Sequence, residues 1–306
     1  MSKIPSAAAR HMASTGSVLL CDTLQVSPDS DESLPRCRHE GGVYYSPFGW
    51  KPKTAKEMLQ FGFCYRQNQL QLGLEDNRSL IKSRPLLLRA EGGEPRLGAP
   101  GSQQTSASEM TWLGHACVLW SAGGLNFLTD PVFSGRCSPS QWAGPKRFTR
   151  VPEGTERLQV DVILLSHTHY DHLDNDTVRK YGGTDGPLWV CPVGVKALLT
   201  RLGVLNVVEL DWWDSLEYAD GRGRLARITF TPAAHWTNRG LLDINTCLWG
   251  SFCVRTNPPD NAATKSNNSS SFYFSGDTAY DEALFKTIGA KLGPFDAAAI
   301  GVGAYV

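Results

Sequence analysis

Three of the seven histidines in this chain lie within one short stretch, LLSHTHYDHLD, at residues 164–174. His167 and His169 are two positions apart, so both would point to the same side of an extended chain, while Asp171 and His172 follow in the next turn. Imidazole and carboxylate groups at this density are typical ligands of zinc and similar divalent metals. The spacing favours two adjacent metal ions over one ion or over a surface loop that happens to be rich in histidine.

The elements on either side of this stretch suit a catalytic loop. A buried apolar strand, VDVILL, precedes it, and a helix is predicted directly after it, from Asn175 to Tyr181. Further helices are predicted at 194–202 and 280–288, among many short apolar runs with β-branched and aromatic residues from residue 110 onward. This pattern predicts an α/β domain in which two sheets pack as a sandwich with outer helices.

Two more candidate ligands stand at the ends of predicted strands. His235 ends the run ARITFTPAAH, and Asp277 follows SFYFSG. Residues at strand ends can converge on one edge of a sheet, because the strands fix where their loops begin. Both positions are compatible with a side chain that meets the histidine-rich loop, although each alone is more typical of an ordinary residue at the end of a strand.

Composition narrows the setting of this site. The chain has 306 residues, of which 30 are basic and 30 acidic, so a general surface for nucleic acid is not expected. Eight cysteines without a C-x-x-C pair favour a reducing compartment. The N-terminus lacks the apolar core of a signal peptide, and no apolar run reaches the length of a membrane span. An intracellular protein is expected, in the cytosol or at the cytoplasmic face of internal membranes.

The sequence divides into three parts. Residues 1–40 are predicted to be a disordered leader, since they are rich in Ser, Ala, Pro and charge. Residues 41–109 form a predicted arm and linker, in which aromatic residues are interleaved with lysines. This mixture suits either membrane contact or packing of the aromatics on the domain. The catalytic domain is predicted from residue 110 to residue 306.

The pattern H-x-H-x-D-H after an apolar strand resembles the metallo-β-lactamase superfamily, whose fold is a four-layer αβ/βα sandwich. More closely, the chain is similar to the N-acylphosphatidylethanolamine-hydrolysing phospholipase D family. The similarity covers about residues 111–305 and rests on these stretches: TWLGHACVLW, FLTDPVFSGRCSPSQWAGPKRF, ILLSHTHYDHLD, ELDWWD, FTPAAHW, LWGSF, FSGDTAY and GPFDAAAIGVGAY.

The resemblance implies two zinc ions. His167, His169 and His235 would bind the first, Asp277 would bridge both, and Asp171 and His172 would bind the second together with a histidine from a later segment. No histidine follows His235 in this chain. We therefore expect the second site to lack one ligand, and the chain to be a truncated product or an incomplete gene model.

The resemblance also implies a reaction. A hydroxide held by the metals would attack phosphorus in N-acylphosphatidylethanolamine, releasing N-acylethanolamine and phosphatidic acid. Asp171 is also a candidate proton acceptor, which competes with its role as a ligand. A phospholipid substrate, a peripheral membrane surface and a homodimer are the implied partners.

Several further residues have two open interpretations. His115 and Asp130 either support the ligand loops or are polar groups satisfied in the core. The loop residues Gln141, Trp142, Lys146 and Arg147 either line the substrate entrance, as the resemblance implies, or form a solvated basic loop.

Two other functions compete with this one. The chain could be another hydrolase of the superfamily, such as a nuclease, lactonase or thioesterase. It could also be a catalytically inactive truncated chain that binds a membrane or a partner.

Overall fold

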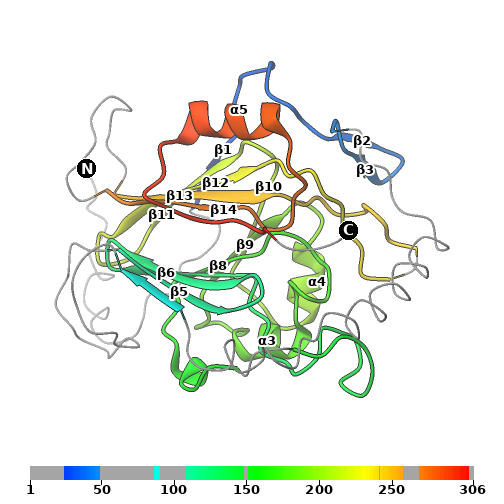
Figure 1. The fold of residues 1–306 in the computed structure, drawn as a ribbon, viewed down its shortest axis with the longest axis vertical. Coiled ribbons are helices and arrows are strands. Elements are labelled where there is room, and N and C mark those ends of the chain that lie inside the picture. The colour runs from blue at the N-terminus through cyan, green and yellow to red at the C-terminus, as the bar shows by residue number, and fades with distance from the viewer. Residues whose placement is uncertain are drawn as a thin grey trace, which may run out of the picture.

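The computed structural model describes residues 24–48, 86–89, 108–147, 151–240, 242–257 and 269–302. Two sheets lie face to face in the middle of the molecule (Figure 1). The helix α5 (Glu282–Leu292) covers the outer face of one sheet, and α3 (Asn175–Lys180) and α4 (Lys196–Arg201) cover the outer face of the other. The predicted four-layer αβ/βα sandwich is therefore confirmed. None of the helices in the described ranges is long and apolar enough to cross a membrane.

One sheet has seven strands and the other has six. The seven-stranded sheet runs in the order β10 (Val207–Leu210), β9 (Leu188–Pro192), β8 (Val162–Leu164), β7 (Leu125–Thr129), β6 (Cys117–Ala122), β5 (Glu109–Gly114) and β4 (Leu86–Arg89). The six-stranded sheet runs in the order β1 (Gln25–Ser27), β11 (Ser215–Ala219), β12 (Leu225–Thr231), β13 (Ser251–Thr256), β14 (Ser271–Phe274) and β15 (Ala297–Ala299). A separate hairpin pairs β2 (Arg38–Glu40) with β3 (Val43–Tyr45), and a short 3-10 helix spans Thr155–Arg157.

Strand β8, which leads into the histidine-rich loop, is buried on both faces. Val162 and Leu164 belong to the large core between the two sheets, whereas Ile163 belongs to the smaller core under α3 and α4. A parallel strand covered on both sides favours an unbroken apolar run, which is what VDVILL provides. The packing of β8 on both faces therefore fixes the position at which the histidine-rich loop begins.

The topology brings the ends of several strands to one edge of the sandwich. Strands β7, β8, β9 and β10 are parallel to one another, so the loops after β7 and β8 leave from the same edge. In the other sheet β12 and β14 are both antiparallel to β13 and therefore run the same way as each other. The turn between β5 and β6 lies at the edge where β7 ends, because β6 is antiparallel to β7.

The N-terminal segment differs from its prediction. A disordered leader over residues 1–40 is wrong for residues 25–27 and 38–40, which form β1 and β2. The segment is tied to the domain because Lys291 Nζ lies 2.9 Å from Asp29 Oδ2 and the Trp213 indole donates to Pro35 O at 2.9 Å. These contacts with distant residues cannot be predicted from composition. The prediction of disorder rested only on the polar composition of the segment.

The domain boundary predicted at residue 110 also differs from the structure, because a strand before residue 110 belongs to the domain. Strand β4 pairs antiparallel with β5 and so extends the seven-stranded sheet towards the N-terminus. Most of the predicted arm, residues 49–85 and 90–107, lies outside the described residues, and so do residues 1–23. The idea that this arm contacts a membrane stays a prediction.

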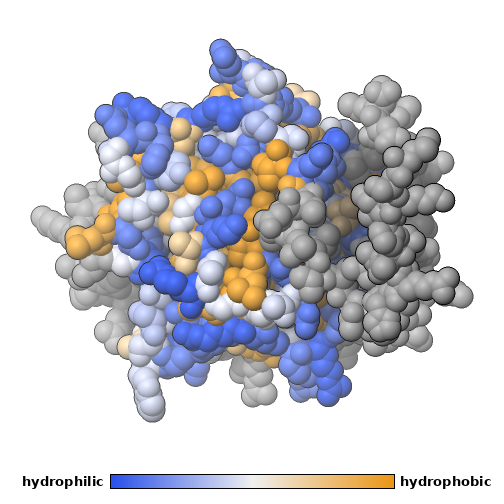
Figure 2. All heavy atoms as spheres, turned by 180° about the vertical axis from the view of Figure 1, so that it is seen from behind, coloured by the Kyte–Doolittle hydropathy of each residue, from blue (hydrophilic) through white to orange (hydrophobic). Residues whose placement is uncertain are grey.

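The surface carries several exposed apolar side chains. On the face seen in Figure 2, hydrophobic residues gather near the centre between hydrophilic ones. Trp142 and Leu242 are 95% and 98% exposed and stand on the loops that follow β7 and β12. Two strongly exposed apolar side chains therefore belong to loops that leave the sandwich at the edge described above.

Candidate metal centre

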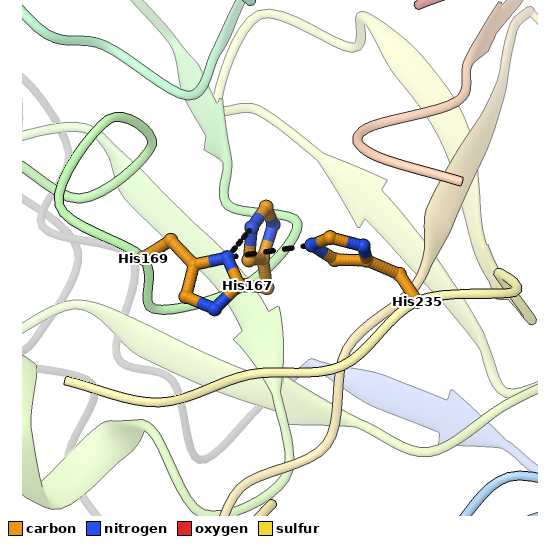
Figure 3. A group of neighbouring side chains, drawn as sticks. All are labelled: His167, His169 and His235. Carbon is orange, nitrogen blue, oxygen red and sulfur yellow. Dashed lines mark hydrogen bonds between the residues drawn. The ribbon is translucent and has the colours of Figure 1, made fainter. Parts of the chain in front are cut away.

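Three imidazole rings from two loops converge at this edge. His167 and His169 come from the loop after β8, and His235 comes from the loop after β12 (Figure 3). His167 Nε2 lies 2.9 Å from His169 Nδ1, which in turn lies 3.3 Å from His235 Nε2. A tetrahedral ion with bonds of about 2.0–2.1 Å places its ligand atoms about 3.4 Å apart. The three nitrogens are therefore spaced much as one ion would hold them.

The protonation of His167 follows from its neighbours. The hydroxyl of Ser166 donates to Asp130 Oδ2 at 2.5 Å, so its oxygen must accept from His167 Nδ1, which is 2.9 Å away. In the neutral ring the other nitrogen, Nε2, then carries a lone pair, and it points at the other two histidines. This is the tautomer that a metal ligand requires.

Burial keeps these three rings uncharged. Desolvation, followed by repulsion from the neighbouring histidines, holds the pKa of His167 well below its ordinary value. Burial also lowers the pKa of His169 to about 4 and that of His235 to about 3. All three rings are neutral at pH 7, so their nitrogens can bind a cation.

A second group of side chains lies beside the first. The ligand atoms of His115, Asp171 and His172 all lie within 4.8 Å of one another. His115 Nε2 contacts Asp171 Oδ2 at 3.1 Å, and the His115 backbone has a φ of 51°, which is unusual for a residue other than glycine. Asp277 stands between the two groups, because its Oδ2 lies 3.3 Å from His172 Nε2 and 3.7 Å from His235 Nε2.

The second group is charged, unlike the first. Burial acts to lower the pKa of His172, but the carboxylates of Asp277, Asp171 and Asp130 outweigh it and raise this pKa well above its ordinary value. Burial also acts to raise the pKa of Asp171, yet His172 and His115 hold it well below the usual range. In the metal-free protein a proton on His172 therefore balances the carboxylates around it.

Asp130 is the buried support of both groups. It has no exposed surface, and its Oδ2 accepts from His172 Nδ1 at 2.6 Å, while Oδ1 accepts from the Ser166 amide at 2.7 Å. With Nδ1 of His172 occupied in this way, Nε2 is the nitrogen left to face the site. Asp130 thus fixes the ring of one candidate ligand and the residue preceding His167.

Close backbone contacts bring the two sheets together at this point. The Gly250 amide donates to Ser166 O at 3.1 Å, which joins the start of β13 to the histidine loop. Gly276, directly before Asp277, has a φ of 53°, and a Cβ there would come within 2.7 Å of Ser166 Cβ. Only glycine allows the loop after β14 to approach so closely, and this approach carries Asp277 into the cluster.

The side chains present fit a pair of divalent metals. The first group offers three neutral imidazole nitrogens, and the second offers carboxylates and an imidazole. The Nε2 atom of His172 is buried and makes no well-formed hydrogen bond within the described part of the chain. Mixed imidazole and carboxylate ligands suit zinc and other divalent transition metals. The structure thus brings together all six residues that the sequence predicted as ligands: His167, His169, Asp171, His172, His235 and Asp277.

The four residues predicted to contact substrate occupy different surroundings. The guanidinium of Arg147 donates to the carbonyls of Val132 and Leu113, so it ties two loops together. The side chain of Gln141 folds back on Arg136, accepting from its amide at 3.0 Å and donating to its carbonyl at 3.1 Å. Trp142 and Lys146 are exposed.

Other residues with a part in the site were not predicted. Ser166 lies inside the motif, but its contacts with Asp130 could not be read from the sequence. Asp174 also lies in the motif, yet it accepts from the amide and hydroxyl of Ser134 at 2.9 and 2.8 Å and caps α3. Arg239 lies four residues after His235, and its guanidinium donates hydrogen bonds to backbone carbonyls of the histidine loop. Its only sequence signal is its proximity to a candidate ligand.

Comparisons with known proteins agree with this architecture. The sequence model of the β-lactamase superfamily domain matches residues 125–306. The match covers more than half of the chain. This chain belongs to the β-lactamase superfamily.

Two relatives share 40% identity with the chain. One is N-acyl-phosphatidylethanolamine-hydrolyzing phospholipase D 1 of Caenorhabditis elegans, over 202 residues that cover 64% of this chain and 53% of the relative. The other is the mitochondrial N-acyl-phosphatidylethanolamine-hydrolyzing phospholipase D of Saccharomyces cerevisiae, over 184 residues that cover 60% of this chain and 37% of the relative. The chain thus matches about half or less of the length of each of these relatives.

Solved structures are more distant. A metallo hydrolase of Ignicoccus hospitalis aligns with 17% identity and a TM-score of 0.41, over 62% of this chain and 69% of that structure. A diiron β-hydroxylase from Streptomyces venezuelae aligns with 23% identity and a TM-score of 0.40, over 62% of this chain and 34% of that structure.

Proposed function

We propose that this chain carries the site of a zinc-dependent hydrolase that cleaves N-acylphosphatidylethanolamine into N-acylethanolamine and phosphatidic acid. The observation that carries the proposal is the pairing of two ligand groups with Asp277 between them, 3.3 Å from His172 and 3.7 Å from His235. The substrate class is proposed from the names of the two relatives that share 40% identity. Zinc is proposed from the balance of imidazole and carboxylate ligands.

Each side chain then has a role. His167, His169 and His235 would hold the first ion, Asp171 and His172 the second, and Asp277 would contact both. Two divalent ions supply a water of lowered pKa, about 7, and positive charge to offset that of a phosphodiester. Asp130 orients the ring of His172 through Nδ1.

Asp171 was expected to serve as ligand and as proton acceptor. Its pKa lies well below the usual range, because His172 and His115 stabilise the carboxylate form. A carboxylate that holds a proton so weakly is a good metal ligand but a poor general base at neutral pH. The proposal therefore gives Asp171 the ligand role.

The loops around the site suit a lipid surface. Trp142 is 95% exposed, and Leu242, on the loop that carries His235, is 98% exposed. An indole ring with an apolar body and a polar N–H favours the boundary between lipid and water. We propose that the protein works as a peripheral enzyme at a phospholipid surface, with Trp142 and Lys146 on the side that meets it. A homodimer stays a prediction.

The test is a substrate panel with the purified chain and added zinc. N-acylphosphatidylethanolamine in mixed micelles should yield N-acylethanolamine and phosphatidic acid in equal amounts, measured by mass spectrometry. A lactone, a thioester and a simple phosphodiester serve as competing substrates. Faster turnover of one of these three would replace the lipid with another substrate of the superfamily, while no turnover by zinc-loaded protein would contradict the proposal as a whole.

A further inference from the structure

One arginine on the His235 loop holds the histidine-rich loop at both ends. Arg239 Nη1 donates to the carbonyl oxygens of Thr168 at 2.9 Å and Leu173 at 2.8 Å. Its Nη2 donates to Asn175 Oδ1 at 2.6 Å. The residues between these contacts include His169, Asp171 and His172, so one guanidinium spans the segment that carries three of the loop's four candidate ligands.

The arginine is itself held in place. The carboxylate of Asp243 accepts from the Arg239 amide at 3.1 Å and from the Gly240 amide at 2.7 Å. The Tyr170 ring stacks on the guanidinium, with its centroid 4.0 Å from Cζ. A planar guanidinium can stack and donate several fixed hydrogen bonds at once, which a lysine ammonium cannot do.

A second contact joins the same two loops. Thr237 Oγ1 accepts from the Thr168 amide at 3.1 Å and lies 2.6 Å from Thr168 Oγ1. The Thr237 amide in turn donates to Asn245 Oδ1 at 3.0 Å, and Asn245 Nδ2 donates to Tyr44 O at 3.2 Å. Thr237 therefore makes one contact between the loops, and Arg239 makes two more with the backbone of the histidine-rich loop.

We propose that Arg239 is a positioning residue for the metal centre, setting the separation between His235 and the loop that carries His167, His169, Asp171 and His172. His235 is the ligand that the other sheet contributes to the first ion, so its position relative to His167 and His169 depends on how the two loops are joined. The inference rests on the proposed metal site. It adds a residue that contacts neither metal nor substrate but determines how tightly the metal is held.

The experiment measures metal binding by the full chain and by the variants Arg239→Met and Arg239→Lys. The probes are Zn²⁺, in competition with a chromophoric chelator, and Co²⁺, whose absorption spectrum reports ligand geometry. Arg179→Met is the matched control, since Arg179 lies on the neighbouring helix α3 with its side chain 58% exposed, where its guanidinium donates to Asp176 Oδ1 at 2.8 Å. Urea unfolding of each metal-free protein gives the fraction that is folded.

The expected result is a loss of zinc affinity of about 10- to 100-fold in Arg239→Met, which is typical when a partner that orients a metal ligand is removed. The Co²⁺ spectrum should change, and Arg239→Lys should recover only part of the loss. A merely structural role would lower the unfolding midpoint without changing the affinity or spectrum of the folded fraction.

The outcomes separate this inference from the proposed function. Unchanged affinity and spectrum in folded Arg239→Met would overturn the role of Arg239 while the metal site stands. If Arg239→Met does not fold, Arg239→Lys decides, and wild-type affinity in that variant would overturn the role. A wild-type chain that binds neither metal would overturn the proposed metal site, and with it this inference.

Discussion

The two ligand groups lie side by side but are built in opposite ways. The first, His167, His169 and His235, is a cluster of neutral rings whose pKa values are depressed by burial. The second, around Asp171 and His172, is a network of opposite charges in which carboxylates raise the pKa of His172. The difference in charge does not follow from residue type alone, since histidine occurs in both groups.

The difference predicts how each group behaves without metal. In the first group three nitrogen atoms face one another, and the tautomer of His167 leaves its Nε2 with a lone pair and no proton to share. A bound cation can accept lone pairs from all three nitrogens at once. In the second group a proton on His172 already offsets the nearby carboxylates. The first group should therefore depend on metal more strongly, and variants can test that contrast.

The largest effect is expected from His167→Ala. The variant removes one of three ligands from the group that has no internal substitute for the ion. Hydrolysis should fall by more than about 100-fold, beyond the usual loss for residues that merely support a ligand. Metal content by elemental analysis should fall with it, while circular dichroism shows a folded chain. Retained turnover in a metal-replete preparation would contradict the assignment of this ligand.

A smaller effect is expected from Asp171→Asn, which alters only the second group. We expect the bound metal to fall by one ion per chain and the rate to fall by about 100-fold, the upper end of the range for a perturbed metal site. The first ion should stay, because none of its three rings is changed. Asp176→Asn, with a side chain that is 66% exposed on α3, is the control and should leave both readings unchanged. Loss of both ions would show that the two groups are not separable.

The same contrast shows what the sequence could and could not predict. The spacing in SHTHYDH predicted a metal-binding loop, and the family resemblance singled out His235 and Asp277, whose positions at strand ends fit because topology delivers strand ends to one edge. The charge of His172 could not be predicted, since it depends on three carboxylates from three loops.

Long-range hydrogen bonds explain the other omissions. Arg239 meets Leu173 across 66 positions of sequence, and strand β1 pairs with β11 across the length of the domain. Neither contact has a local pattern, so Arg239 was not singled out and residues 25–27 were predicted to be disordered. The helices after β8 and β14 were predictable because their caps, Asp174 and Asp281, and apolar residues are local.

Asp130→Asn probes the link between the groups and should have a moderate effect. An amide can donate its own N–H towards His172 Nδ1, which would move the ring proton to Nε2, the nitrogen that faces the site. The affinity for the second ion should fall by about 10-fold. The free energy of unfolding should fall by about 1–3 kcal/mol, because the buried Ser166 hydroxyl loses its acceptor when an NH₂ group replaces Oδ2.

The control for Asp130→Asn is a half-buried aspartate next to the same sheet. Asp161 lies before β8, at the opposite edge, where it accepts from the Asn126 amide at 2.8 Å and from Arg224 at 2.9 Å. Asp161→Asn should lower stability without changing metal affinity. Equal losses of affinity in the two variants would mean that Asp130 acts only through general stability.

The smallest effect is expected from Trp142→Ala, which leaves both ligand groups intact. Because the side chain is 95% exposed, the free energy of unfolding should change by less than about 0.5 kcal/mol. Sedimentation with phosphatidylcholine vesicles should show binding weakened by about threefold, since part of an aromatic side chain no longer enters the lipid. Leu205→Ala, at a residue 54% exposed before β10 and thus on the opposite edge of the sheet, is the control. Equal vesicle binding by wild type and Trp142→Ala would remove this loop from the proposed lipid surface. The contrast between the two ligand groups would still stand, because it depends on residues of the metal centre and not on Trp142.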